Sequence, residues 1–305
     1  MLVTTVSTEY RILPSFDRPY TYLITGASRS LGLGYAEKLL AASPEVRVVV
    51  AVRNPAKADQ VQALANKPEN KDRVLIVEFD VEREESVKAA AEKLASHPFL
   101  ENGLDALIAN AGVFCGLHTT PSQLGLDDLD ANFRVNVYGV IHTVTHLLPL
   151  LKKGQGKQIF VLSSIVTSFG GPFCQMPGAV TYSMSKAAVQ MYTVKLAREL
   201  GPEGFTVIPF HPGYGELPFP SFILSGASPL ESRLENLSRI RLSYLDPDWL
   251  DPSLPPAVKT DMNHDGGGEI ETEEAVTLAA KNVLLAATPA DNCRFMSYNG
   301  TDLPW

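Results

Sequence analysis

The chain has 305 residues, of which 45% are hydrophobic and 20% charged, proportions typical of a globular protein with a large packed core. Its 26 basic and 34 acidic residues give a net charge of −8 without a lysine- and arginine-rich run, so nucleic acid is not an expected partner. No apolar stretch approaches the roughly 20 residues of a membrane span, and the first 18 residues lack the features of a secretory signal. We therefore expect a cytoplasmic protein that does not span a membrane.

Short β-rich apolar runs alternate with longer segments of helical periodicity, which predicts a parallel sheet covered by helices on both faces. The predicted strands are residues 21–25, 46–52, 74–80, 106–110, 157–162 and 206–210, with a seventh near 293–297. The predicted helices are residues 36–42, 84–96, 133–151 and 183–200. This order indicates one doubly wound, Rossmann-like α/β domain over residues 19–305, preceded by an arm over residues 1–18. The three cysteines lie far apart without metal-binding spacing, so no metal site is expected.

A glycine-rich turn follows the first predicted strand and opens a helix. Glycines there allow tight backbone angles and close approach to a phosphate, and the amide groups of the helix start can hold a pyrophosphate. The candidate binding residues are Gly26, Ser28, Arg29, Ser30, Leu31 and Gly32. A purely structural turn is the alternative, but the position in the first βαβ unit favours dinucleotide binding.

Arg53 comes directly after the second predicted strand, where an NAD-binding protein would place a carboxylate on the ribose hydroxyls. Arg53, helped by Arg29, would instead pair with a ribose 2′-phosphate, since planar guanidinium groups bind phosphate in a bidentate manner. The sequence therefore predicts NADP(H) as cofactor. The alternative is that both are ordinary surface arginines.

Tyr182 and Lys186 are four residues apart and so share one face of a predicted helix. Such a pair is common and is uninformative alone, but the strand over residues 157–162 ends in two serines, of which Ser164 is the preferred candidate to reach a substrate carbonyl. Asn136 lies in the helix that follows the fourth strand. These residues form the candidate catalytic centre.

Together these motifs resemble the short-chain dehydrogenase/reductase family from about Tyr20 onward. The resemblance implies that Ser164 holds the carbonyl oxygen, Tyr182 protonates it, Lys186 binds the ribose and tunes Tyr182, and Asn136 anchors a relay water. It also implies further cofactor contacts from Asp80, Val81, Asn110, Ala111, Gly112, Pro212, Gly213, Val258 and Thr260.

The segment from Ala51 to Pro55, the spacing from Ser164 to Tyr182 and the segment ending at Trp305 resemble fungal ketoreductases similar to norsolorinic acid ketoreductase, and sniffer-type carbonyl reductases. This implies NADPH-dependent reduction of a ketone or aldehyde, including an aromatic polyketide ketone of fungal secondary metabolism. Aromatic residues that either line the substrate pocket or belong to the core are Phe114, Phe169, Phe173 and Tyr214. Related proteins form dimers and tetramers, so a homodimer or homotetramer is a candidate assembly.

The sequence departs from the family pattern in two places. Ser30 replaces a glycine of the cofactor turn, and residues 215–257 separate Pro212-Gly213 from the motif that contains Val258 and Thr260. This tract is either a translated intron or late insertion, or a substrate lid. Two functions without turnover therefore stay open beside the reductase: a non-catalytic NADP(H)-binding regulator, and an inactive splice form with a disrupted nicotinamide loop.

Overall fold

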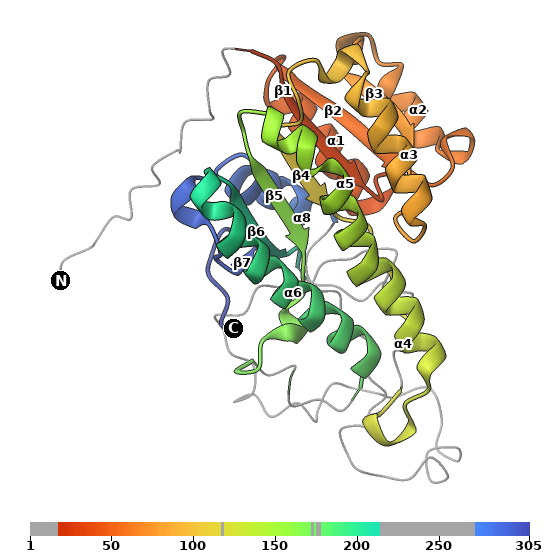
Figure 1. The fold of residues 1–305 in the computed structure, drawn as a ribbon, viewed down its shortest axis with the longest axis vertical. Helices are drawn as coiled ribbons and strands as arrows, with labels where there is room; N and C mark the ends of the chain where they lie inside the picture. The colour runs from red at the N-terminus through yellow and green to blue at the C-terminus, as the bar shows by residue number, and fades with distance from the viewer. Residues whose placement is uncertain (1–17, 117–118, 172–173, 175–177, 214–271) are drawn as a thin grey trace, which may run out of the picture.

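A seven-stranded parallel sheet forms the centre of the protein, in the order β3-β2-β1-β4-β5-β6-β7 (Figure 1). The computed structural model describes residues 18–116, 119–171, 174, 178–213 and 272–305. The strands are β1 (Tyr20–Thr25), β2 (Val46–Val52), β3 (Val74–Glu78), β4 (Ala106–Ala109), β5 (Gln158–Leu162), β6 (Thr206–His211) and β7 (Met296–Ser297). The predicted Rossmann-like fold is confirmed.

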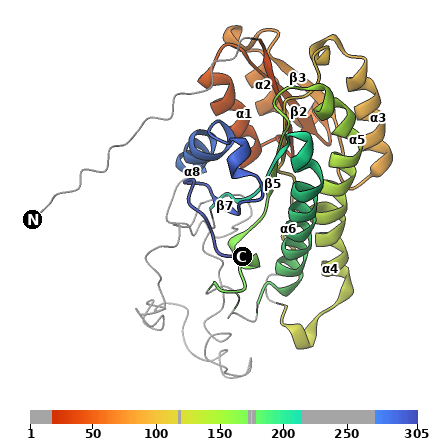
Figure 2. The ribbon, with the colours of Figure 1, turned by 60° about the vertical axis from the view of Figure 1, so that its left-hand side comes forward.

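Helices cover both faces of this sheet. One face carries α1 (Ser30–Ala42), α2 (Asp59–Ala65) and α8 (Thr272–Ala279), and the other carries α3 (Glu84–Ala95), α5 (Gly139–Lys153) and α6 (Val180–Leu200). Figure 2 shows the two layers on opposite sides of the strands. The helix α4 (Leu126–Phe133) continues into α5 through a π-helical turn, Arg134–Tyr138, and a second π-helical turn, Ala280–Leu284, follows α8. Each layer has its own apolar core against the sheet.

The central strands are buried on both faces, which explains why their sequences are continuous apolar runs rather than alternating ones. In β2, every residue except Arg47 is fully buried, and its valines contribute to both core clusters. The carboxyl ends of β1 and β4 lie side by side, although β2 and β3 separate them in the sequence. Ligands of doubly wound proteins bind in the crevice beyond this point, where the strand order reverses.

The helices differ from the prediction mainly at their starts. The first helix begins at Ser30 instead of residue 36. The glycines near its start have low helix propensity, so the sequence did not predict a helix there, but close packing requires them: a Cβ at Gly32 would lie 2.6 Å from Asn110 Nδ2. The helix predicted over 133–151 is preceded by α4, which begins at Leu126. Neither α2 nor α8 was predicted, because each is a short helix in which few apolar residues repeat.

A buried carboxylate fixes the beginning of the described chain. Asp105 has no exposed surface, and Arg18 Nη2 lies 2.5 Å from its Oδ1. The same carboxylate accepts hydrogen bonds from the backbone amides of Thr21, Gln155 and Gly156. Because a buried charge is tolerated only when it is paired and hydrogen-bonded, this cluster joins β1 to the start of β5. Residues 1–17 of the predicted arm and the tract 215–257 lie outside the described residues.

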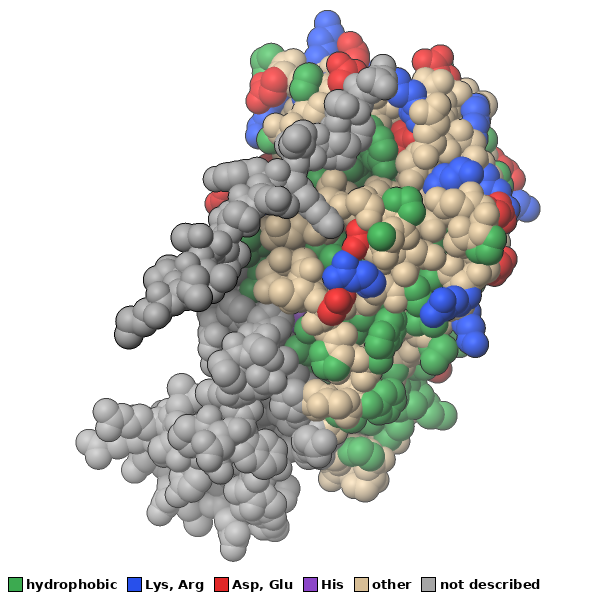
Figure 3. Space-filling view, turned by 90° about the vertical axis from the view of Figure 1, so that its left-hand side faces the viewer, with side chains coloured by type: hydrophobic (Ala, Val, Ile, Leu, Met, Phe, Trp, Pro, Cys, Tyr) green, Lys and Arg blue, Asp and Glu red, His purple; other side chains and the backbone are tan. Residues whose placement is uncertain are grey.

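The surface shows no segregation of charge on the face seen in Figure 3, where basic and acidic side chains are interspersed. In the part of the chain that the structure describes, no helix combines the length and apolar character that crossing a bilayer requires. Within the same residues, no group of three histidine, cysteine, aspartate or glutamate side chains comes together as a metal site.

Candidate active site

A cleft of about 530 Å³ opens at the carboxyl ends of the central strands. Among its walls are most of the residues that the sequence pointed to for the cofactor, namely Gly26, Ser28, Arg29, Ser30, Leu31, Gly32, Arg53, Asp80, Val81, Asn110, Ala111, Gly112, Tyr182, Lys186 and Pro212. Gly213 follows Pro212 with a positive φ of 97°. Val258 and Thr260 lie outside the described residues, so their part in the site stays a prediction.

The glycine-rich turn is packed too closely for a side chain at Gly26 or Gly32. Gly26 has a φ of +65°, and a Cβ there would lie 2.8 Å from the Ala111 Cα. The helix α1 starts directly after this turn, with Arg29 at its N-cap position. The Arg29 side chain does not accept a hydrogen bond from the first amide groups of α1, so these donors are not capped by that residue. This arrangement suits a phosphate anion.

Asn110, which follows β4, holds the glycine-rich turn through hydrogen bonds. Its Nδ2 donates to the carbonyls of Thr25 at 2.9 Å and Gly26 at 3.2 Å, and its backbone amide donates to Thr25 Oγ1 at 3.1 Å. The Ala111 amide donates to the same threonine hydroxyl. Asn110 therefore uses its side-chain donor to hold the turn, which is a supporting role that the sequence did not indicate.

Basic side chains gather at the end of β2. Arg53 and Arg29 both line the cleft, and so does Lys57, which the sequence analysis missed. Asn54 Oδ1 accepts a hydrogen bond from the Ala56 amide and starts the short 3₁₀ turn that carries Lys57 back to the cleft. An Asn-Pro pair directly after the strand was the available signal, because it predicts such a turn.

Asp80 and Val81, which follow β3, also line the cleft. Asp80 Oδ1 accepts from the Glu82 amide at 3.2 Å, so the carboxylate shapes the turn that precedes α3. The Val81 carbonyl lies 3.3 Å from His142 Nδ1 on α5, and Val81 itself is 6% exposed. The turn before α3 is thus held by the Asp80 side chain and by His142 on α5.

Tyr182 and Lys186 lie on the first turns of α6, and Lys186 Nζ is 5.7 Å from the centre of the Tyr182 ring. Ser164 follows β5, is 7% exposed and hydrogen-bonds the Tyr182 side chain. Lys186 Nζ donates to the Leu162 carbonyl at 2.8 Å. The three side chains predicted to act on a carbonyl therefore meet at one point, beside the cleft.

Burial sets the protonation of this group. Desolvation raises the pKa of Tyr182 to about 12, and the hydrogen bond from Ser164 opposes that rise. Desolvation also lowers the pKa of Lys186 to about 8. At neutral pH the tyrosine is protonated and the lysine is charged, which is the state needed to give a proton to a carbonyl oxygen.

Asn136 sits in the π-helical turn between α4 and α5 and is 1% exposed. Its Oδ1 accepts from the Val113 amide at 2.8 Å, and its Nδ2 donates to the Val113 carbonyl at 2.9 Å and to Ser185 Oγ at 3.0 Å. A Cβ on Gly112 would lie 3.2 Å from Asn136 Oδ1 and 3.6 Å from Lys186 Nζ. Asn136 therefore clamps the segment after β4 against α6, with its side chain engaged by the protein.

An aromatic ring lies directly beside Tyr182. The ring of Phe114 is half-buried and its centre is 4.4 Å from that of Tyr182. Phe169 is 76% exposed, so it does not belong to the core. Phe173 and Tyr214, the other two aromatic residues named from the sequence, lie outside the described residues.

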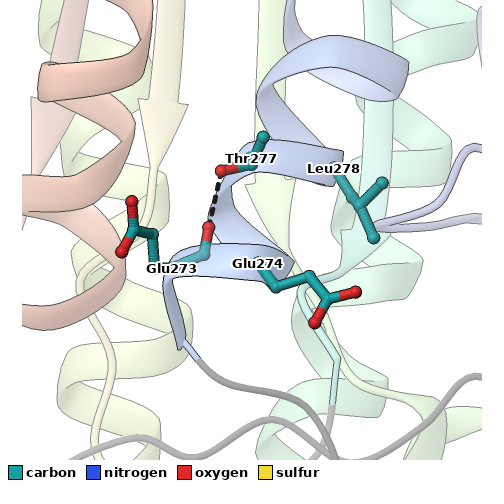
Figure 4. A pocket seen from close by; sticks show the side chains of 4 residues that line it. All are labelled: Glu273, Glu274, Thr277 and Leu278. Carbon is teal, nitrogen blue, oxygen red and sulfur yellow. Dashed lines mark hydrogen bonds between the residues drawn. The ribbon is translucent and has the colours of Figure 1, made fainter.

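A second, shallow hollow of about 400 Å³ lies at the first turn of α8 (Figure 4). Glu273, which lines it, extends toward α1, where its carboxylate lies 3.0 Å from Lys38 Nζ, and the Thr277 hydroxyl donates to the Glu273 carbonyl. Its other lining residues are Glu274 and Leu278. Glu273 therefore joins α8 to α1, whereas the Thr277 hydroxyl bonds within α8.

Comparison with known proteins agrees with this geometry. The family model described as short chain dehydrogenase matches residues 20–219. The chain belongs to the short-chain dehydrogenase/reductase family. An uncharacterized oxidoreductase of Schizosaccharomyces pombe is 34% identical over 198 residues, covering 63% of this chain and 72% of that protein. The short-chain dehydrogenase/reductase AacuF of Aspergillus aculeatus is 33% identical over 208 residues, with 63% and 73% covered.

Solved structures give the same assignment of fold. The carbonyl reductase Sniffer of D. melanogaster is 22% identical with a TM-score of 0.71, covering 94% of this chain and all of that one. The NADPH-bound carbonyl reductase from chicken fatty liver is 25% identical with a TM-score of 0.68 over the same shares. The predicted family and its sniffer-type structural neighbours are thus confirmed, and the chain is an oxidoreductase of this family.

Proposed function

We propose that the protein reduces a ketone or aldehyde to an alcohol with NADPH. The observation that carries the proposal is the meeting of Ser164, Tyr182 and Lys186 beside a cleft with the features of a dinucleotide site. The carbonyl reductases among the structural neighbours support the same reaction class, and one of them is described as NADPH-bound.

The cleft residues fit this cofactor. A Cβ at Gly26 or Gly32 would collide with neighbouring backbone, so this turn requires glycine at both positions, as glycine-rich turns that hold a pyrophosphate do. Arg29, Arg53 and Lys57 give three basic side chains for a 2′-phosphate. When bound, the cofactor supplies the hydride that reduces the carbonyl carbon.

The protein's own residues would handle the carbonyl oxygen. The Ser164 hydroxyl donates a hydrogen bond to that oxygen, and the Tyr182 hydroxyl transfers its proton to it as negative charge develops. Lys186 supplies positive charge that favours the tyrosinate left behind. Asn136 keeps Gly112 and Val113 in place beside both groups.

For the substrate we propose a flat aryl ketone, such as an aromatic polyketide ketone. Phe114 supports this class, because its ring lies 4.4 Å from that of Tyr182 and would stack on an aromatic group whose carbonyl reaches the tyrosine. An alkyl ketone would lose this contact. The assembly as a homodimer or homotetramer, and a cytoplasmic location, stay predictions.

The test is NADPH consumption with a panel of aromatic ketones, quinones and aldehydes. We expect turnover by the wild-type chain and its loss in Tyr182→Phe, which keeps the ring and removes the proton donor. The variant should still bind NADPH, measured by nucleotide fluorescence. NADPH binding without turnover of any carbonyl in the wild type would instead favour the non-catalytic regulator or the inactive splice form.

We also propose that residues 215–257 are an insertion in one domain over residues 19–305. The family match ends at residue 219, which supports an interruption at this place. A chain that lacks residues 215–257 separates the two origins. Activity only in the shortened chain would indicate a translated intron or late insertion, whereas activity only in the full chain would indicate a substrate lid.

A further inference from the structure

A buried glutamine lies one helical turn beyond Lys186 and is not used by the proposed chemistry. Gln190 is 5% exposed, and its Oε1 accepts hydrogen bonds from the hydroxyls of Ser163 and Thr167. The Thr167 contact measures 2.6 Å. Tyr182, Lys186 and Gln190 follow one another at intervals of four residues and so share one face of α6. A buried amide oxygen needs hydrogen-bond donors, and the two donors to Oε1, Ser163 and Thr167, both come from the segment after β5.

These two partners flank Ser164. Ser163 precedes it, and Thr167 closes the 3₁₀ turn that Ser164 begins, because the Thr167 amide donates to the Ser164 carbonyl at 3.1 Å. The Ser163 amide also donates to the Phe210 carbonyl of β6 at 2.8 Å. The backbone that carries the Ser164 hydroxyl is therefore held on both sides, and the side chain that reaches both sides is Gln190.

The helix and the turn must keep a fixed relation if the reaction is to work. Ser164 belongs to the turn after β5, and Tyr182 belongs to α6, yet both hydroxyls must meet one carbonyl oxygen. Lys186 ties α6 to the Leu162 carbonyl, and Gln190 ties it to residues on either side of Ser164. A displacement of about 1 Å between reacting groups can reduce a rate about 100-fold.

We propose that Gln190 is a positioning residue that sets the place of the Ser164 hydroxyl relative to Tyr182. This rests on the proposed carbonyl reduction, in which Ser164 and Tyr182 bind the same oxygen. Gln190 acts through the turn and is not among the residues that line the cleft, so it makes no direct contact with a cofactor bound there.

The experiment compares Gln190→Leu and Thr167→Val with a matched control, Thr193→Val. Thr193 is fully buried on the same helix, but its hydroxyl donates to the Val189 carbonyl within α6 and does not reach β5. The control therefore loses a buried hydroxyl without touching the turn. We expect kcat to fall at least about tenfold in the first two variants and less than twofold in the control, with the Kd for NADPH changed less than about twofold in all three.

A background lacking the serine hydroxyl separates positioning from general damage. If Gln190 acts through Ser164, then Gln190→Leu should reduce kcat less than about twofold when Ser164→Ala is already present, because the group that it positions is gone. An equal loss in both backgrounds, or an unchanged kcat in Gln190→Leu alone, would overturn the proposal. The conservative variant Gln190→Glu keeps an acceptor oxygen at the position of Oε1 and should retain more activity than Gln190→Leu.

A measurement without turnover keeps this inference separate from the proposed function. Hydrogen exchange at the amides of residues 163–168 should become at least about tenfold faster in Gln190→Leu and stay unchanged in Thr193→Val. A wild-type chain that reduces no carbonyl, but whose exchange shows this contrast, would count against the proposed reductase and still support Gln190 as the residue that holds the turn. Unchanged exchange in Gln190→Leu would refute the positioning role of Gln190, whatever the activity.

Discussion

Replacing Lys186 with methionine should change how the stability of the protein depends on pH. Methionine keeps an unbranched side chain and removes the charge. Lys186 is 4% exposed, and its burial lowers its pKa from 10.5 to about 8. Between these two values the unfolded chain binds more protons than the folded chain. The charged lysine therefore costs stability below pH 8, and this cost disappears as the pH rises toward 10.5.

The magnitude follows from the size of the pKa shift. A lowering from 10.5 to about 8 corresponds to about 3 kcal/mol of unfolding free energy at pH 7. At pH 9.5 about 1 kcal/mol of that cost remains, so about 2 kcal/mol is recovered. The hydrogen bond from Lys186 to the Leu162 carbonyl adds an offset that is lost in the variant. Because a neutral lysine amine still donates this hydrogen bond, the offset is largely the same at pH 7 and pH 9.5, and the change with pH identifies the burial of charge.

Urea unfolding of the cofactor-free wild type and of Lys186→Met at pH 7 and pH 9.5 measures the effect. The unfolding free energy of the variant minus that of the wild type should fall by about 2 kcal/mol between the two conditions. Other titrating groups cancel in this difference. A difference that is the same at both pH values would show that Lys186 titrates alike in the folded and unfolded chains, and the reasoning from burial would be wrong.

Three further variants test the cleft and the residue beside Tyr182. Gly26→Ala should lower the unfolding free energy by at least about 1 kcal/mol, because alanine is strained at positive φ, and should also weaken NADPH binding. The control is Gly125→Ala, where nothing lies within 4 Å of the added Cβ; equal effects of the two variants would contradict the role of the turn. Arg53→Ala combined with Lys57→Ala should raise the Kd for NADPH at least about tenfold and that for NADH less than about twofold, and a parallel loss of both would argue against a 2′-phosphate site. Phe114→Ala should reduce kcat/KM for aryl ketones up to about tenfold more than for alkyl ketones, and no change in this ratio would exclude stacking.

Much of the fold and of the candidate site could be predicted from the sequence, for reasons that lie in the geometry of parallel sheets. The carboxyl ends of parallel strands share one edge, so a serine after β5 and a glycine turn after β1 had to lie at the same end of the molecule. The spacing of Tyr182 and Lys186 placed both on one helical face. The absence of a carboxylate after β2 pointed to Arg53, which lines the cleft.

The remaining features depend on contacts between distant residues. Asn110 was assigned to the cofactor and lines the cleft, and its Nδ2 also holds a turn 85 residues earlier in the chain, a partner that no local pattern reveals. Gln190 reaches Ser163 across 27 residues, and a polar residue in a helix usually faces solvent. The early start of α1 was missed because glycine disfavours helices, whereas here close packing decides.

The clamp that Asn136 places on Val113 has a consequence for altering the substrate range. Both backbone groups of Val113 are fixed by this one amide, while Asn110 secures the start of the same segment against the glycine turn. Phe114, one residue later, places its ring 4.4 Å from that of Tyr182. Libraries designed for new ketones should therefore begin at residue 114 and leave residues 110–113 untouched, because variation before that point would damage cofactor binding and catalysis together.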